Sequence, residues 1–235
     1  GRCKTQGVYY TPAFITQYIV GVALGEYLER QEKALWEEIG IDQIRANAVR
    51  QRQRAEIQFW ERYRDEVLTQ TRVVDPACGS GAFLIAAFDF LNRKYEEVNE
   101  RLAALKTEDE SGEFVGQRSL FDLTKTILNQ NLYGVDLSPE SVEITKLSLW
   151  LKTAERGKTL TYLDDNIKVG NSIIADPAFD PAYAFDWEAA FPAVFASGGF
   201  DVVIGNPPYV RQELLTPFKP YLQAHYAADD GVADS

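Results

Sequence analysis

Val73-Val74-Asp75-Pro76-Ala77-Cys78-Gly79-Ser80-Gly81 joins a short apolar strand to an acidic residue and a glycine-rich turn. A helix is predicted to start near Ala82 and to run to about Leu105. Open α/β sheets bind their ligands at the carboxyl ends of their strands, where this turn lies. Gly79 and Gly81 let the backbone approach a ligand closely, and the helix N-terminus offers free N–H groups. The turn therefore suits a carboxylate or a phosphate; the alternative is a turn that merely requires glycine.

The chain around this turn alternates strands with helices. Strands are predicted at residues 71–75, 132–136, 166–169 and 200–204. Helices are predicted at residues 120–131 and from Pro139 onward, and Trp187, Phe191 and Phe195 have the spacing of a short core-facing helix. This alternation predicts an α/β fold with a Rossmann-like, doubly wound and mainly parallel sheet.

A helical segment is predicted before the sheet. Apolar residues at spacings of three and four from Phe14 indicate an amphipathic helix, with Thr11 as its N-cap and Pro12 at its first position. A second helix, at residues 42–68, is rich in arginine. It could touch phosphates, but nearby acidic residues partly cancel its charge, and we expect a solvated face. We expect an N-terminal segment at residues 1–69, a core at 70–215 and the start of a further part at 216–235.

Composition narrows the classes of protein that the chain can represent. A net charge of −11 disfavours a polyanionic partner, unless the binding surface is local or lies elsewhere. Two cysteines make a disulfide framework implausible, and a reducing cytoplasm is expected. No apolar run is long enough to span a membrane. Methionine is absent from all 235 residues, so we expect either an excised piece of a longer protein or a chain from which some residues are missing.

Asn206-Pro207-Pro208-Tyr209 follows the fourth predicted strand and also lies at the carboxyl edge. The two prolines fix the backbone and remove two N–H donors, so the carbonyl between them is left to accept a hydrogen bond. The Asn206 side chain adds a second acceptor. Two acceptors on one NH₂ group draw its nitrogen out of conjugation and make it a better nucleophile. Tyr209 offers a face on which a planar base can stack; the alternative is a rigid proline turn.

Asp136 ends the second predicted strand and can accept hydrogen bonds from two ribose hydroxyls. The alternative is that Asp136 caps the helix that Pro139 opens. Cys78 is expected to be a small packed residue, and His225 to have a surface or core role. The sequence has no cluster of histidine and cysteine that would bind a metal, so no metal site is expected.

These motifs together resemble the amino-methyltransferases of DNA. The likeness rests on residues 75–81, 133–136 and 206–209, and on Tyr9-Tyr10-Thr11-Pro12 upstream. It is most specific to the N6-adenine methyltransferase domain of fused restriction-modification enzymes and related phage-defence methylases. The resemblance implies transfer of a methyl group from S-adenosylmethionine to the exocyclic amine of adenine in double-stranded DNA, with the target base flipped out.

The resemblance also implies which residues bind the cofactor. These positions would be Tyr10, Thr11, Pro12, Asp75, Pro76, Ala77, Gly79, Gly81, Phe83, Asp136, Leu137 and Asn171. Asp136 would hold the ribose hydroxyls and Leu137 would touch the adenine ring. Asn171 stands where many relatives place aspartate to contact the cofactor's exocyclic amine. The catalytic positions would be Asn206, Pro207, Pro208 and Tyr209.

Three other interpretations stay open at this stage. A methyltransferase acting on glutamine in peptide-release factors shares the Asn-Pro-Pro-Tyr logic, although the upstream motif and the polar insertion at residues 106–119 favour DNA. The second interpretation is methylation of cytosine at its exocyclic amine, which the tetrapeptide alone does not distinguish well from methylation of adenine. A fragment that binds cofactor without methylating is the third. The resemblance further implies more sheet and a target-recognition domain, sometimes with an endonuclease in the same chain, and we expect the target-recognition domain to be missing here.

Overall fold

The computed structural model describes residues 11–107, 120–153, 162–207 and 216–226. Within these residues, four parallel strands form one sheet in the order β3-β2-β1-β4, with β1 at Val73–Asp75, β2 at Leu132–Asp136, β3 at Ile167–Val169 and β4 at Val202–Val203. Val73 pairs with Leu132 on one side and with Val202 on the other. This confirms the predicted parallel α/β sheet, although three of the strands are shorter than predicted.

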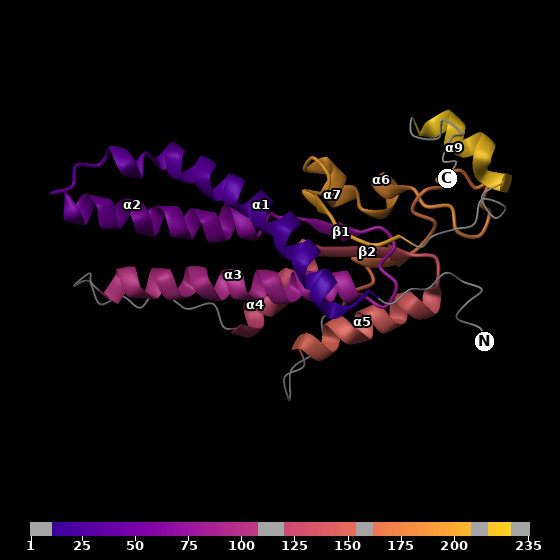
Figure 1. Cartoon of the computed structure of the whole chain (residues 1–235), viewed down its shortest axis with the longest axis horizontal. Helices are drawn as coiled ribbons and strands as arrows, with labels where there is room; N and C mark the ends of the chain where they lie inside the picture. The colour runs from indigo at the N-terminus through magenta and orange to yellow at the C-terminus, as the bar shows by residue number, and fades with distance from the viewer. Residues whose placement is uncertain (1–10, 108–119, 154–161, 208–215, 227–235) are drawn as a thin grey trace.

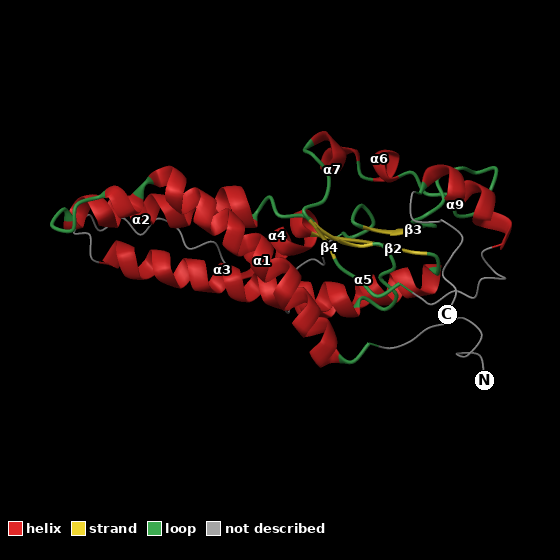
Figure 2. Cartoon of the chain, turned by 45° about the horizontal axis from the view of Figure 1, so that its top comes forward, coloured by secondary structure: helices red, strands yellow, loops and turns green. Residues whose placement is uncertain are grey.

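Both faces of the sheet are covered, because the central strands β1 and β2 present buried apolar side chains in both directions. Val73, Leu132 and Val202 belong to the larger core, which α1 (Ala13–Ile39), α3 (Ala82–Thr107) and α5 (Pro139–Thr153) complete. Val74, Tyr133 and Val135 point into a smaller aromatic core with Phe185 and Phe191. The short helices α6 (Trp187–Ala190) and α7 (Pro192–Ala196) cover that second face (Figures 1 and 2).

A long helical arm extends away from the sheet (Figure 1). It consists of α1, the 3₁₀ turn η2 (Ile41–Gln43), α2 (Val49–Arg62) with its π-helical continuation η3 (Tyr63–Leu68), and the far half of α3. Aromatic rings pack inside the arm, where Phe59 lies edge-on to Trp36 at 4.9 Å and to Trp60 at 4.8 Å. The arm is therefore held by its own core, continuous with the core beneath the sheet.

The remaining elements connect the strands. The helix α4 (Leu120–Thr126) and the π-helical turn η4 (Ile127–Asn131) precede β2, and η5 (Thr216–Phe218) and α9 (Lys219–His225) follow the sheet. In the described part of the chain, no helix is both long and apolar enough to cross a membrane.

Three predicted helix details are wrong. Pro12, not Thr11, is the N-cap of α1, and no side chain caps this helix. The helix predicted at residues 42–68 is divided. The helix α2 begins only at Val49, and the last six residues of the predicted helix form the π-helix η3. The helix predicted through Trp187, Phe191 and Phe195 is also divided, since Phe191 leaves helical geometry before Pro192 opens α7. A proline lacks the N–H that would continue the preceding helix.

Candidate active site

Two carboxylates meet where the neighbouring strands β1 and β2 end. Asp75 is 1% exposed, and its Oδ1 accepts a hydrogen bond from the backbone N–H of Ala77 at 3.0 Å. Asp136 accepts from the N–H of Gly79 at 2.8 Å and from the N–H of Ser138 at 2.9 Å. The α5 helix is capped by Ser138, whose hydroxyl accepts from Ser141, so capping α5 is not the role of Asp136.

The glycine-rich turn is held from both sides. The N–H of Cys78 donates to the carbonyl of Val135 at 2.9 Å, and the hydroxyl of Thr145 donates to the carbonyl of Gly79 at 2.8 Å. Gly81 has a φ of +84°, and a Cβ there would lie 2.9 Å from Cγ2 of Thr145. At Gly79, where φ is +52°, a Cβ would meet nothing within 4 Å. The turn is therefore rigid, and open space lies over Gly79.

Thr145 was not found by the sequence analysis. It is fully buried between Val142 and Leu149 on the stripe of α5 that packs against the core. A threonine on an otherwise apolar helix stripe needs a hydrogen-bond partner, and this is the signal that could have found it. The carbonyl of Gly79 is that partner.

Burial changes the acid–base chemistry of the site. Loss of hydration raises the pKa of Asp75 to about 7; the Ala77 N–H opposes this rise, and the nearby Asp136 charge adds to it. Burial also raises the pKa of the Cys78 thiol, so this cysteine stays a protonated packing residue, as predicted. Among the described residues, no group of three His, Cys, Asp or Glu side chains could hold a metal ion.

The segment after β4 lies against both other motifs. A Cβ on Gly205 would lie 2.7 Å from Oδ1 of Asp75, so only glycine lets the chain pass this carboxylate. The next residue, Asn206, donates from Nδ2 to the hydroxyl of Thr11 at 3.1 Å. Motifs 195 residues apart in sequence thus meet at one edge of the sheet. Pro207 is exposed beside them, and Pro208 and Tyr209 lie outside the described residues.

The other predicted site residues differ in their surroundings. Phe83 is 4% exposed and belongs to the larger core, whereas Leu137 is 51% exposed at the site edge. Pro76 and Ala77 are half-buried in the turn, Pro12 is exposed, and Tyr10 lies outside the described residues.

Asn171 is buried and bonded within its own loop. Its Nδ2 donates to Asp180 at 2.8 Å, and its Oδ1 accepts from the N–H of Ile173 at 3.3 Å. Its backbone N–H donates to the carbonyl of Tyr183 at 2.6 Å. The amide therefore organises the loop after β3, and sequence reasoning did not find that arrangement.

A parallel sheet with a glycine turn and two carboxylates at its carboxyl edge is typical of α/β folds that bind nucleotide-like ligands, and it is consistent with the α/β methyltransferase fold. Residues 130–234 match the family model described as Eco57I restriction-modification methylase. Residues 130–234 are therefore similar to the methylases of Eco57I restriction-modification enzymes, which confirms the resemblance that the motifs indicated.

Curated relatives agree with this similarity. The type II restriction enzyme and methyltransferase RM.Eco57I of Escherichia coli is 28% identical over 66% of this chain, which is 16% of the relative. The putative type II restriction enzyme and methyltransferase RM.MjaORFECS2P of Methanocaldococcus jannaschii is 29% identical over 73% of this chain and 15% of the relative. The adenine-specific methyltransferase PglX of Streptomyces coelicolor is 27% identical over 60% of this chain and 12% of the relative. The match thus spans less than a fifth of each relative's length.

Proposed function

We propose that this chain is the catalytic core of an S-adenosylmethionine-dependent DNA methyltransferase that modifies the exocyclic N6 amine of adenine, within a restriction-modification or phage-defence system. The observation that carries the proposal is the meeting of Asn206 with Thr11 at 3.1 Å, directly beside the buried Asp75. This contact joins the amine-binding motif to the two segments that the resemblance assigns to the cofactor. The Streptomyces relative is an adenine-specific methyltransferase, which supports the choice of base.

The residues present fit S-adenosylmethionine. Open space over Gly79, the N–H groups at the start of α3 and two carboxylates suit a ligand that carries a carboxylate, an ammonium group and a ribose. The Gly79 turn would hold the carboxylate, Asp75 would face the ammonium group, and Asp136 would accept from the ribose hydroxyls. Leu137, half-exposed at the rim, would pack on the adenine ring. When bound, the cofactor supplies an electrophilic methyl group.

Asn206 and Pro207 would bind the target amine. The hydrogen bond from Nδ2 of Asn206 to Thr11 fixes the amide plane and assigns its other end, Oδ1, as an acceptor. The carbonyl of Pro207 would be the second acceptor. Together they would orient the amine lone pair for in-line attack, which is catalysis by position and electrostatics. A base within a duplex must first leave its stack, at a cost of a few kcal/mol.

The test is to identify the methylated nucleoside. The chain is incubated with duplex DNA and S-adenosylmethionine carrying a tritiated methyl group, and the DNA is digested and separated by chromatography. We expect label in N6-methyladenine. Label in N4-methylcytosine, transfer to a glutamine-containing peptide in place of DNA, or no transfer at all would contradict the proposal.

Asn206→Ala tests the role of the amide. Loss of one positioned acceptor is expected to lower the rate of transfer by about 100-fold or more, as for other groups that stabilise developing charge. Cofactor affinity, measured by calorimetry, should stay unchanged, because Asn206 would contact the target amine. Asn99→Ala, which removes a half-buried amide from α3, is the control and should keep full activity. An active Asn206→Ala enzyme would show that the amide does not hold the amine.

A further inference from the structure

The tip of the helical arm has the opposite charge to the chain as a whole. The chain has a net charge of −11, but residues 43–55 contain four arginines and no acidic residue. This segment includes the loop between η2 and α2 and the first half of α2. The end of the molecule at which η2 and α2 meet (Figure 1) therefore carries a local excess of positive charge, although the chain as a whole is acidic.

The arginines of the arm divide into two groups. Toward the sheet, Arg62 pairs with Glu38 and Glu66 at 2.8 Å each, and Arg64 pairs with Asp65. At the tip, Arg52 pairs with Glu56 at 3.0 Å. The other three tip arginines, which are exposed, have no acidic partner in the part of the chain that the structure describes: Arg45, Arg50 and Arg54. The solvated face that we expected from the sequence thus applies to the base of the arm, where the charges cancel.

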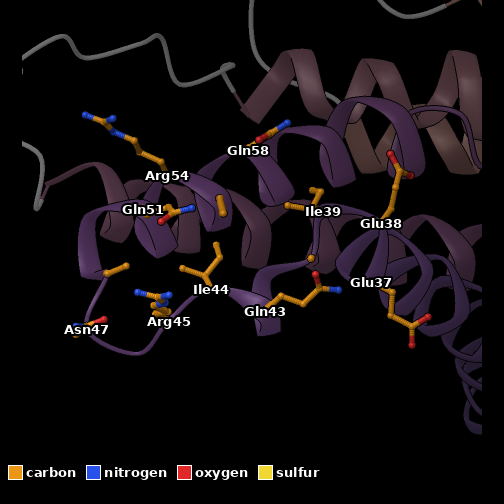
Figure 3. A pocket seen from close by; sticks show the side chains of 13 residues that line it. Glu37, Glu38, Ile39, Gln43, Ile44, Arg45, Asn47, Gln51, Arg54 and Gln58 are labelled. Carbon is orange, nitrogen blue, oxygen red and sulfur yellow. The ribbon is translucent and has the colours of Figure 1, made fainter.

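Hydrogen-bond donors line one end of an open hollow at the tip. The hollow has a volume of about 1070 Å³ and lies between the end of α1 and α2. Arg45, Gln51 and Arg54 gather at one end of it (Figure 3). Glu37 and Glu38 line the other end, and both already face cations, Lys33 and Arg62 respectively. The arginine end therefore offers uncompensated positive charge with amide groups beside it.

This chemistry suits phosphodiesters better than a protein surface. Arginine forks and side-chain amides are common donors to phosphate oxygens. Protein interfaces bury aromatic anchors at their centre, but the arm's aromatic rings Phe59 and Trp60 are themselves buried. Among residues 40–58, which the structure describes in full, Val49 is the exposed large apolar side chain. A nucleic-acid backbone is the anionic partner that needs no apolar contact.

We propose that the arm tip, through Arg45, Arg50 and Arg54, binds the phosphate backbone of DNA without regard to sequence. The choice of DNA over another polyanion rests on the proposed function. With 27 residues, α1 spans roughly 40 Å at 1.5 Å per residue, so the tip lies far from Asn206 and beyond the opposite end of the sheet. That length corresponds to about 12 base pairs of duplex. The tip therefore contacts DNA that flanks the target base, and methyl transfer does not use it.

Binding of a fluorescein-labelled 30-base-pair duplex, followed by anisotropy at several salt concentrations and without cofactor, tests the tip. Arg50→Gln/Arg54→Gln removes two unpaired charges from α2. Arg30→Gln/Arg93→Gln is the matched control, because it removes two exposed arginines from α1 and α3 and changes the net charge equally. The tip variant should lower the slope of log affinity against log salt by about 2, one for each phosphate contact. The control should bind like the unaltered chain, and circular dichroism should show both folded.

Three other results would overturn the proposal. Equal weakening by both double variants would mean that only overall charge matters. No binding of DNA by the unaltered chain, or tighter binding of polyglutamate than of the duplex, would also overturn it, and the latter would indicate an acidic protein partner. The methylation assay separates this proposal from the proposed function: Asn206→Ala should lower the rate of transfer by about 100-fold or more but keep tip binding. If the chain binds DNA through the tip but methylates no adenine, the tip proposal stands and the proposed function is wrong.

Discussion

Asp75 is a buried carboxylate that faces no cation in the described part of the chain. Its pKa of about 7 means that hydration lost on folding costs more than its single Ala77 hydrogen bond returns. A site of this kind is suited to a cationic ligand group, which would replace the lost hydration. The same burial that prepares the site for a ligand therefore destabilises the empty protein increasingly as the pH rises from about 4 to 7.

Asp75→Asn should stabilise the ligand-free protein in a pH-dependent way. Below about pH 4 both folded and unfolded chains hold the proton, and the variant and the original should differ little. Between about pH 4 and 7 only the unfolded chain ionises, so the original loses about 1.4 kcal/mol of stability per pH unit relative to the variant. Urea unfolding at pH 4 and pH 8 measures this difference. An equal difference at both pH values would contradict the raised pKa.

At the scale of single elements, glycines at strand ends let neighbouring segments pack closely. Gly170 follows β3, and a Cβ there would lie 2.2 Å from Cδ2 of Phe185 in the smaller core. The aromatic ring must therefore move if any side chain is added. This contact holds the loop after β3 against the second face of the sheet.

Gly170→Ala should lower the free energy of unfolding by about 1–3 kcal/mol, the usual cost of overpacking a core. Gly21→Ala is the matched control, because a Cβ at Gly21 on α1 meets nothing within 4 Å. Alanine there should raise stability by about 0.5–1 kcal/mol, through better helix propensity. Chemical denaturation of both variants gives the comparison. Equal effects on stability would show that the Phe185 contact does not constrain the loop.

At the scale of the whole molecule, one hydrogen-bonded link joins the arm to the sheet. The hydroxyl of Tyr27 on α1 donates to Oδ1 of Asp201 at 2.9 Å, and Oδ2 of Asp201 accepts from the backbone N–H of Arg72 at 2.7 Å. Burial and then the Asp201 hydrogen bond raise the pKa of Tyr27 to about 12, so the hydroxyl remains a donor at neutral pH. The carboxylate thus bridges α1 and the start of β1, just before β4.

A double-mutant cycle measures this link. Tyr27→Phe and Asp201→Asn should each lower the free energy of unfolding by about 1.5–3 kcal/mol, typical of a hydrogen bond to a charged group. The double variant should lose less than the sum, with a coupling energy of about 0.5–1.5 kcal/mol. Strict additivity in urea unfolding would mean that the hydroxyl and the carboxylate do not stabilise each other.

Local patterns in the sequence were enough to predict the strand–turn–helix units, the parallel sheet and the two carboxylates at its edge. Alternation of elements, glycine in a turn and proline after a strand act over a few residues, so they can be read without knowing the partners. The same reasoning placed Thr11 as a helix cap and left the role of Thr145 unseen. Both errors concern side chains whose partners are distant: Asn206 lies 195 residues from Thr11, and Gly79 lies 66 residues from Thr145. Long-range packing decides which distant groups meet, and it also separated the neutralised arginines at the base of the arm from the unpaired ones at its tip.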